Sequence, residues 1–331
     1  MAVVKSILSN FLAFLLSAIL TAVPYKGILL PVIDTSEDDC LLNAEMLSDV
    51  HLEEKELFRQ FFLKAGLKNC QNAKANIDAV VVSGDLTNYA DEPSLAKYYE
   101  IISEYSPAPV ITAAGNHDIG HAGDRDKTDI TREEAMANFI RYQNAYAGTE
   151  NTANYYSQTV NGFKFIVIGD EVLDGGHWDG ISMSQEQLDF LDRELADGTK
   201  DGKPAFVVSH WPIKDINGEQ TIWPDCGIDP AEYDIPAILE KYDNVFYISG
   251  HMHAGIKADV IGEMYGLSNA EQVNGVTYLN LPTYGIINMF GAPWSVIGAQ
   301  LEVYSDKVIF RPRNFLTNKW YVNSTFTFEL V

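Results

Sequence analysis

Short runs of apolar, often β-branched residues alternate with longer amphipathic segments from Leu42 onward. Apolar runs of this length, bounded by glycine or polar residues, are typical of buried β-strands. They lie at Ala79–Ser83, Val110–Ala114, Phe163–Ile168, Ala205–Val208 and Val245–Ser249. The alternation predicts a layered α/β architecture.

Capping signals and apolar spacing indicate helices between these strands. Thr131 with Glu134, and Ser184 with Gln187, match the capping box, in which two residues each bond the backbone N–H of the other. A further helix is indicated by an acidic start followed by an apolar face, formed by Leu57, Phe58, Phe61 and Phe62.

The last part of the chain has a strand pattern. Alternating segments lie at Val276–Leu279, Ala299–Tyr304 and Lys307–Phe310, with a turn expected at Ser305-Asp306. No repeat, low-complexity tract or long linker interrupts the chain, so we expect residues 25–331 to form one domain.

The N-terminal segment has the pattern of a targeting sequence. Lys5 precedes the apolar stretch Phe11–Val23, and Pro24 follows it. This stretch is shorter than the roughly 17 to 25 residues of a membrane-spanning helix, but no clear A-x-A cleavage site follows it. We therefore interpret residues 1–24 as a secretory signal peptide or a short anchor, and expect a secreted, periplasmic or cell-surface bacterial protein.

Composition limits the classes of partner. With 331 residues and 47% apolar content, the chain can bury a sizeable core. Its 46 acidic and 23 basic residues give a net charge of −23, which repels the phosphate backbone of nucleic acid. A nucleic-acid polymer is therefore not an expected partner, and the sequence leaves the oligomeric state open.

Three cysteines, an odd number, occur in the chain. Cys40, Cys70 and Cys226 allow either one disulfide with a leftover thiol or three free thiols, and spacing does not decide between them. They are not arranged as a metal site.

Five polar strings contain five of the seven histidines. Four of the five predicted strands end directly at one of these strings or at its glycine, which is where α/β proteins bind ligands. In chain order, the strings are Ser48-Asp49-Val50-His51, Gly84-Asp85-Leu86-Thr87-Asn88, Gly115-Asn116-His117-Asp118, Ser209-His210 and Gly250-His251-Met252-His253.

Imidazole nitrogens and carboxylate oxygens suit divalent zinc, iron or manganese. Asp49 and His51 are two residues apart, so a turn at a strand end can direct both side chains at one ion, and His251 and His253 repeat the spacing. Two such pairs suggest two ions. Asp85, directly after an apolar run, can bridge them with one oxygen each.

In this order, the motifs DxH, GDxxN, GNHD, a lone histidine and GHxH resemble those of the calcineurin-like metallophosphoesterase superfamily. The resemblance spans residues 49–253, and five ordered motifs are far more specific than any one of them. It implies a four-layer α/β/β/α sandwich, in which two mixed β-sheets are flanked by helices.

The resemblance also implies roles for individual residues. One metal ion would be held by Asp49, His51, Asp85 and His253, and the other by Asp85, Asn116, His210 and His251. A hydroxide between the ions would be the nucleophile, because a bound cation lowers the pKa of water from about 15.7 to about 7. By the same resemblance, His117 would protonate or stabilise the leaving oxygen and Asp118 would orient its imidazole.

The function expected from this resemblance is metal-dependent hydrolysis of a small phosphoester. The GDLTN and GNHD strings look most like small bacterial phosphodiesterases of the cyclic-nucleotide type. A phosphomonoesterase or nucleotidase, and a non-catalytic surface protein stabilised by metals, are the alternatives. From the short stretch after His253 we expect no separate nucleotide-recognition domain. Asn88 and Asp118 stand where purple acid phosphatases, by the same resemblance, have a tyrosine and a glutamate.

Several conspicuous side chains have a simpler interpretation. Asn88 either faces the phosphate or the ligand surroundings, or caps its own loop. Two further histidines are expected in solvated loops, and four large aromatic residues are expected to be packing residues. These are His121 and His177, and Trp211, Trp223, Tyr284 and Trp294.

Overall fold

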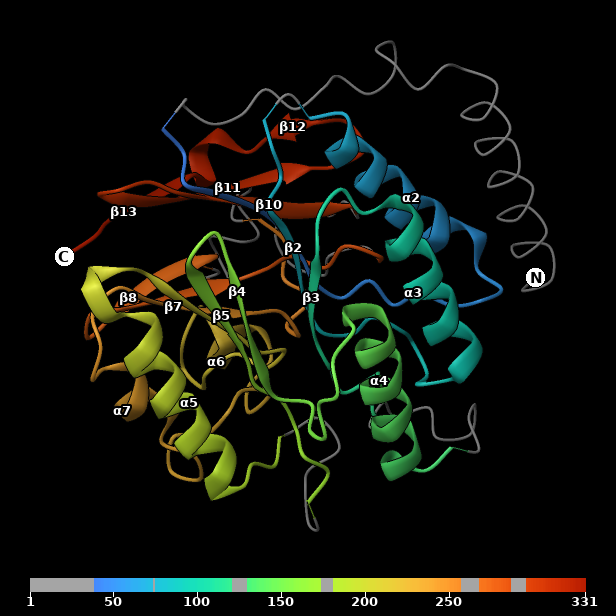
Figure 1. Ribbon diagram of the computed structural model, residues 1–331, viewed down its shortest axis with the longest axis horizontal. Coiled ribbons are helices and arrows are strands. Elements are labelled where there is room, and N and C mark those ends of the chain that lie inside the picture. The colour runs from blue at the N-terminus through green and yellow to red at the C-terminus, as the bar shows by residue number, and fades with distance from the viewer. Residues whose placement is uncertain (1–38, 74, 121–129, 174–180, 257–267, 287–295) are drawn as a thin grey trace.

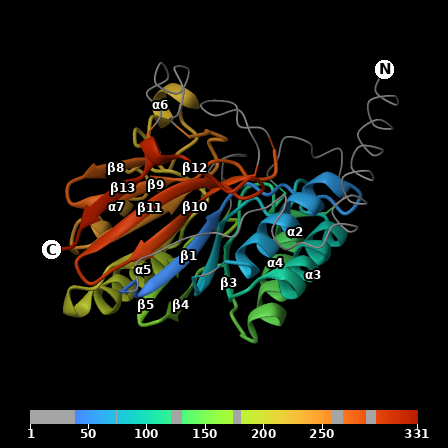
Figure 2. The same ribbon diagram turned by 90° about the horizontal axis from the view of Figure 1, so that it is seen from above.

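Two β-sheets face each other between two layers of helices (Figures 1 and 2). The structure, a computed structural model, describes residues 39–73, 75–120, 130–173, 181–256, 268–286 and 296–331. Within these residues, the four-layer α/β/β/α arrangement expected from the motif resemblance is confirmed.

The first sheet has the strand order β12-β11-β10-β1-β2-β3 within the described residues, with β13 also paired to β11. Strands β1, β2 and β3 are parallel, whereas β10 and β11 are antiparallel to their neighbours, so the sheet is mixed. Its strands are β1 Leu42–Leu47, β2 Ala79–Ser83, β3 Val110–Ala113, β10 Ile297–Val303, β11 Lys307–Asn314, β12 Lys319–Trp320 and β13 Phe326–Glu329.

The second sheet has the order β4-β5-β6-β7-β9-β8 in the part of the chain that the structure describes. Strands β5, β6, β7 and β9 are parallel, and β4 and β8 are antiparallel strands at the two edges. The strands are β4 Tyr156–Val160, β5 Phe163–Val167, β6 Ala205–Val208, β7 Val245–Ser249, β8 Ala270–Val273 and β9 Val276–Asn280.

Helices cover the outer face of each sheet. On the first sheet lie α2 Leu57–Gln71, α3 Glu92–Tyr105 and α4 Arg132–Ala147, and on the second lie α5 Gln185–Gly198 and α7 Ile235–Leu239 (Figure 1). Short helical turns are α6 Glu219–Ile222, η2 Lys200–Gly202 and η3 Val322–Ser324.

The central strands are covered on both faces, which explains why they are apolar runs without alternation. Val81 of β2 and Phe206 of β6 belong to the cluster between the two sheets. Val80 and Val82 face the helices and pack in the cluster that contains Leu63 of α2. The core therefore holds the parallel strands in fixed positions relative to one another.

The predicted strands agree with the structure to within a few residues at each end. The expected capping box at Thr131 is present in full, since its hydroxyl accepts from Glu134 N and the Glu134 carboxylate accepts from Thr131 N. Of the capping box predicted at Ser184, only one of the two hydrogen bonds is present. Ser184 caps Gln187 N, but the buried Gln187 side chain bonds the backbone of Gly169 instead of returning to Ser184.

Cys40, Cys70 and Cys226 are all free thiols, which decides between the two alternatives that the sequence left open. Among the described helices, none combines the length and apolar character needed to cross a bilayer. The predicted signal peptide or anchor at 1–24 lies outside the described residues.

Candidate metal centre

The polar strings converge at one edge of the sandwich because they follow parallel strands. Asp49 and His51 come after β1, Asp85 after β2, and Asn116 and His117 after β3. In the second sheet, one string follows β6 and another follows β7, and these carry His210, His251 and His253. Carboxyl ends of parallel strands meet at the same edge of a sheet, so both sheets contribute side chains to one place.

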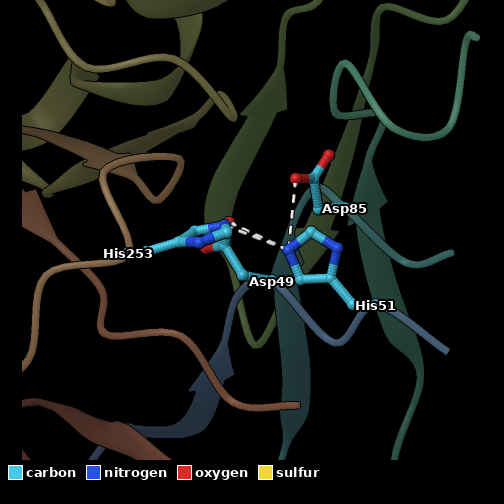
Figure 3. Close-up of side chains that lie close together, drawn as sticks. All are labelled: Asp49, His51, Asp85 and His253. Carbon is cyan, nitrogen blue, oxygen red and sulfur yellow. Dashed lines mark hydrogen bonds and ion pairs between the residues drawn. The ribbon is translucent and has the colours of Figure 1, made fainter. Parts of the chain in front are cut away.

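Four of these side chains form a compact group (Figure 3). One ligand atom from each of Asp49, His51, Asp85 and His253 lies within 4.8 Å of the others. His51 Nε2 lies 3.0 Å from His253 Nε2, and His253 Nε2 lies 3.2 Å from Asp49 Oδ1. Nitrogen and oxygen donors at this separation fit around a single divalent ion.

A second group adjoins the first. His210 Nε2 lies 3.1 Å from Asn116 Oδ1, 3.4 Å from Asp85 Oδ1 and 3.0 Å from His251 Nδ1. All four side chains are buried. The structure thus brings together the seven residues that the motif resemblance implied as ligands, in the two expected sets.

Asp85 belongs to both groups. Its Oδ2 lies 3.5 Å from His51 Nε2, whereas its Oδ1 lies 3.4 Å from His210 Nε2. Each carboxylate oxygen therefore faces a different set of donors. This is the arrangement expected of a residue shared by two cations, and it makes the site a candidate dinuclear centre.

The unpaired atoms of the site fit metal ions better than hydrogen bonds. Asp49 Oδ1 and Asp85 Oδ2 are buried without a hydrogen-bond partner among the described residues. Such atoms are costly unless something else compensates them. Two imidazole nitrogens also face each other at 3.0 Å in each group, and a pair of this kind directs at least one lone pair inward.

Five of the seven candidate ligands also have an unusual backbone conformation. Asp49, His51, Asp85, His251 and His253 have positive φ angles, between 47° and 68°. Non-glycine residues rarely adopt this left-handed region, although aspartate and histidine tolerate it better than most. Each such residue costs on the order of 1–3 kcal/mol, and strain of this kind concentrates at functional sites.

Close approach of the backbone explains two of the motif glycines. A Cβ atom on Gly115 would lie 2.1 Å from Asp85 Oδ1, and one on Gly250 would lie 1.8 Å from Ser48 Oγ. Neither distance is compatible with a side chain, so these positions need glycine for space alone.

Charges in the site shift the ionisation of its members. Burial opposes ionisation of Asp49, but the hydrogen bond and charge of His253 outweigh it and lower the pKa of Asp49 to about 2. Burial also lowers the pKa of His251 to about 3, so this ring is neutral at pH 7 and can donate a lone pair. Burial likewise opposes protonation of His210, yet the charge of Asp85 raises the pKa of His210 to about 9.

His117 lies beside the two donor groups and is partly exposed. Its side chain is 24% exposed, compared with at most 2% for the ligand candidates other than His253. Its Nδ1 is 2.9 Å from the carbonyl oxygen of Asn88, and its Nε2 lies 4.0 Å from Asp85 Oδ2. The ring therefore presents Nε2 toward the metal-binding groups.

The expectation that Asp118 orients His117 is corrected by the structure. Asp118 Oδ1 accepts from the N–H and hydroxyl of Thr87, and Oδ2 accepts from Leu86 N and Gly115 N. These bonds tie the loop after β2 to the loop after β3. Burial and the nearby Asp85 raise the pKa of Asp118 to about 6. The group that bonds the His117 imidazole is instead the Asn88 carbonyl, which lies 2.9 Å from Nδ1.

Of the aromatic residues expected to be packing residues, three are described, and two of these are buried while the third is partly buried. Trp211 and Tyr284 are fully buried in the core. Trp223 also packs on an apolar cluster, but it has a second contact, since its ring stacks on His251 with centroids 5.1 Å apart. His121, His177 and Trp294 lie outside the described residues.

The sequence reasoning missed a supporting segment after β9. Thr283 Oγ1 and Gly285 N both donate to the carbonyl of Asp49, and Asn280 Nδ2 donates to the carbonyl of Gly250. These bonds hold two of the strained loops in place. The signal was the polar Asn-Leu-Pro-Thr-Tyr-Gly stretch directly after an apolar run, which contains neither histidine nor carboxylate.

Comparison with solved structures gives the same fold. A dimetal phosphatase from Danio rerio aligns with a TM-score of 0.57 and 13% sequence identity over 88% of this chain and all of its own. Purple acid phosphatase PPD1 from yellow lupin (Lupinus luteus) seeds aligns with a TM-score of 0.55 and 14% identity over 87% of this chain and 53% of its own. At these identities the likeness concerns the fold alone.

No curated protein sequence matches the chain. A family model does: the model described as calcineurin-like phosphoesterase matches residues 46–255, which is more than half of the chain. The matched segment contains every polar string of the candidate centre. The chain belongs to the calcineurin-like phosphoesterase family.

Proposed function

We propose that the protein is a metal-dependent hydrolase of phosphoesters whose preferred substrate is a small phosphodiester. The observation that carries the proposal is the position of Asp85, whose two oxygens face two separate groups of nitrogen and oxygen donors. Two divalent ions of manganese, iron or zinc fit these donors.

When bound, such ions supply a hydroxide nucleophile at neutral pH and neutralise charge on the phosphoryl oxygens. The chain holds the donor side chains in fixed positions through hydrogen bonds between their loops. Asp49, His51 and Asp85 lie on loops joined by backbone bonds, since Asp49 N donates to Gly84 O and His51 N donates to Asp85 O. Preorganised ligands of this kind spend no energy on reorganisation during the reaction.

His117 is the proposed proton donor to the leaving oxygen. Its imidazole is more exposed than those of the candidate ligands, and a backbone carbonyl bonds its Nδ1. Nε2 is thus the atom that can carry a proton toward substrate. General acids placed in this way contribute about 10²–10⁴ in rate.

A small substrate is proposed because the chain carries a net charge of −23. That field disfavours polymeric nucleic acid, whereas two divalent ions make the site itself locally positive. The preference for a diester is supported by the resemblance of the GDLTN and GNHD strings to small bacterial phosphodiesterases.

The proposal is tested with protein that has been stripped of metal and reloaded with Mn²⁺, Zn²⁺ or Fe²⁺. Bis(p-nitrophenyl) phosphate and p-nitrophenyl phosphate are then assayed side by side. Turnover of the diester above the monoester supports the phosphodiesterase, and the reverse order identifies a phosphomonoesterase. If the protein bound an ester tightly but released no product with any of the three metals, it would be a binding protein and not a hydrolase.

We further propose that the protein is exported, on the basis of the apolar stretch Phe11–Val23 behind Lys5. N-terminal sequencing of protein recovered from a bacterial envelope fraction tests this. A new N-terminus near Pro24 would indicate cleavage, and recovery from the cytoplasm alone would contradict export.

A further inference from the structure

A chain of hydrogen bonds leads from helix α2 to His117. Arg59 Nη1 donates to Glu53 Oε1 at 3.0 Å, and Asn88 Nδ2 donates to the same oxygen at 2.7 Å. The Asn88 carbonyl in turn pairs with His117 Nδ1 at 2.9 Å. Glu53 thus lies two contacts from the proposed proton donor, although it touches neither the histidine nor the candidate ligands.

The last bond in this chain determines the protonation pattern of the imidazole. A carbonyl oxygen can only accept a hydrogen bond, so His117 Nδ1 must carry a hydrogen. In the neutral ring, Nε2 is then the nitrogen without a proton, and in the charged ring Nε2–H points toward the site. If the carbonyl turned away, the ring could rotate or exchange tautomers.

Asn88 is itself held by hydrogen bonds from its backbone and from its side chain. Its backbone N–H donates to Leu52 O over a long distance of 3.3 Å, whereas Nδ2 donates to Glu53 Oε1 at 2.7 Å. The residue is half-buried, and Ala90, two positions later, has a positive φ of 55°. Of these two hydrogen bonds, the one to the Glu53 carboxylate is the shorter, and it ties Asn88 to the segment that follows β1.

Glu53 is itself held in place. Its side chain is 27% exposed and Arg59 is 17% exposed, so the pair is partly shielded from solvent. Arg59 also donates to the carbonyl of His51 and pairs with Glu56 at 3.1 Å. Because Arg59 contacts a candidate metal ligand directly, changing it would disturb the metal centre as well. A change at Glu53 therefore tests the orientation of His117 without altering the contact between Arg59 and His51 directly.

We infer that Glu53 is a positioning residue, which acts through Asn88 to hold His117 with Nδ1 protonated and Nε2 facing the substrate. This rests on the proposed function. In the proposed step a hydroxide oxygen bonds to phosphorus as the phosphorus–oxygen bond to the leaving group breaks. The electron pair of the broken bond passes to the leaving oxygen, which takes the Nε2 proton of the charged His117 ring and leaves that ring neutral. The Nδ1 proton stays on the ring throughout and is donated in a hydrogen bond to the Asn88 carbonyl.

The experiment compares Glu53→Ala with wild type on two esters of one phosphate class. The pair is bis(p-nitrophenyl) phosphate and glycerophosphocholine, or p-nitrophenyl phosphate and glycerol 3-phosphate for a monoesterase. The p-nitrophenolate ion leaves without a proton, but an alkoxide needs one. We expect kcat to fall about tenfold or more for the alkyl ester and less than about threefold for the nitrophenyl ester, with KM unchanged.

Two variants control for structural damage. Glu53→Gln keeps an oxygen that accepts from Asn88 and should recover most of the rate on the alkyl ester. Glu56→Ala removes the other carboxylate that pairs with Arg59 and should leave both rates near wild type. Metal content and melting temperature are measured for every variant. Equal losses on both esters with metal retained, or no loss on either, would overturn the inference.

A second readout does not depend on turnover. In zinc-loaded protein with nitrogen-15 histidine, the His117 ring should show a protonated Nδ1 in wild type and a mixture of tautomers in Glu53→Ala, with His117→Gln identifying the signals. An unchanged tautomer in Glu53→Ala would contradict the positioning role. Failure of wild type to cleave any ester would defeat the proposed function, yet this spectrum would still decide the role of Glu53.

Discussion

Trp223 stacks on His251, with ring centroids 5.1 Å apart and planes inclined by only 17°. Metal-binding histidines usually donate their second ring nitrogen to an acceptor that fixes the ring. His251 Nε2 has no such partner among the residues that the structure describes. The indole face therefore takes over the orienting role that a carboxylate or carbonyl has elsewhere.

This contact predicts the behaviour of two variants. Trp223→Leu should weaken metal binding by the second donor group, which contains His251, by about tenfold or more. Loss of a residue that orients a metal ligand commonly has an effect of this size. Trp223→Phe keeps a ring over His251 and should retain most of the affinity. Calorimetric titration of stripped protein with Zn²⁺ measures both. Equal affinity for the leucine variant and wild type would show that stacking is irrelevant to the site.

Asp85→Asn should remove activity and metal together. The amide keeps the shape of the side chain but offers one oxygen and no charge, while Asp85 faces both donor groups. We expect elemental analysis to find fewer than two ions per chain, with phosphoester turnover at background. A variant that kept two ions at full affinity would mean that Asp85 does not bridge them.

His117→Ala should separate binding from catalysis. His117 lies beside the donor groups, with Nε2 at 4.0 Å from Asp85 Oδ2. We expect the variant to hold both ions and to lose about 10²–10⁴ in kcat. Metal analysis and steady-state kinetics on the same preparation test this. Full activity would exclude His117 from proton transfer.

Metal binding by the second donor group should depend on pH because His210, one of its members, must lose a proton first. Burial opposes its protonation, but Asp85 raises the pKa of His210 to about 9, above its ordinary value of 6.5. The proton is therefore held at pH 7 and must leave before Nε2 can bind a metal. Affinity should rise by up to about tenfold per pH unit between pH 7 and 9 and then level off. Titrations in buffers of different ionisation enthalpy should show about one proton released at pH 7.5.

Stability should depend on the buried ion pair between Arg313 and Glu45. Both side chains are fully buried, with Nη2 and Oε1 2.8 Å apart. Arg313→Met would leave the Glu45 carboxylate without its cation, which costs about 3–5 kcal/mol of unfolding free energy. Urea denaturation measures the loss, and Glu45→Leu together with Arg313→Met should recover most of it.

The control for this prediction is an exposed pair. Arg141 and Glu92 lie 2.6 Å apart but are 55% and 51% exposed. Solvent screens such pairs, so Arg141→Ala should leave the urea midpoint unchanged. If both arginine variants behaved alike, burial would not be the cause of the effect at Arg313.

The sequence reveals the metal centre well because its donors are local features. Each donor lies within a few residues of a strand end, and the strands are apolar runs that are easy to recognise. Asp49 with His51, and His251 with His253, carry their geometry in a two-residue spacing. Parallel strands then bring separate strings together without any further signal in the sequence.

Other parts could not be predicted because their partners are distant or are backbone atoms. Strand β1, Leu-Asn-Ala-Glu-Met-Leu, contains a glutamate that can be buried only because Arg313 reaches it from 268 positions away. The acceptor of His117 is the Asn88 carbonyl, a group that every residue has. Asp118 follows a histidine in the chain, but its carboxylate faces the backbone of the neighbouring loop.

Each donor group draws on both sheets. Asp49, His51 and Asp85 follow β1 and β2, whereas His253 follows β7, and the second group is divided in the same way. During translation, the ribosome must therefore release residue 253 before the first donor group is complete, and residue 251 before the second is. Neither donor group can therefore be complete early in synthesis, and metal binding at full affinity would report that both sheets have packed together.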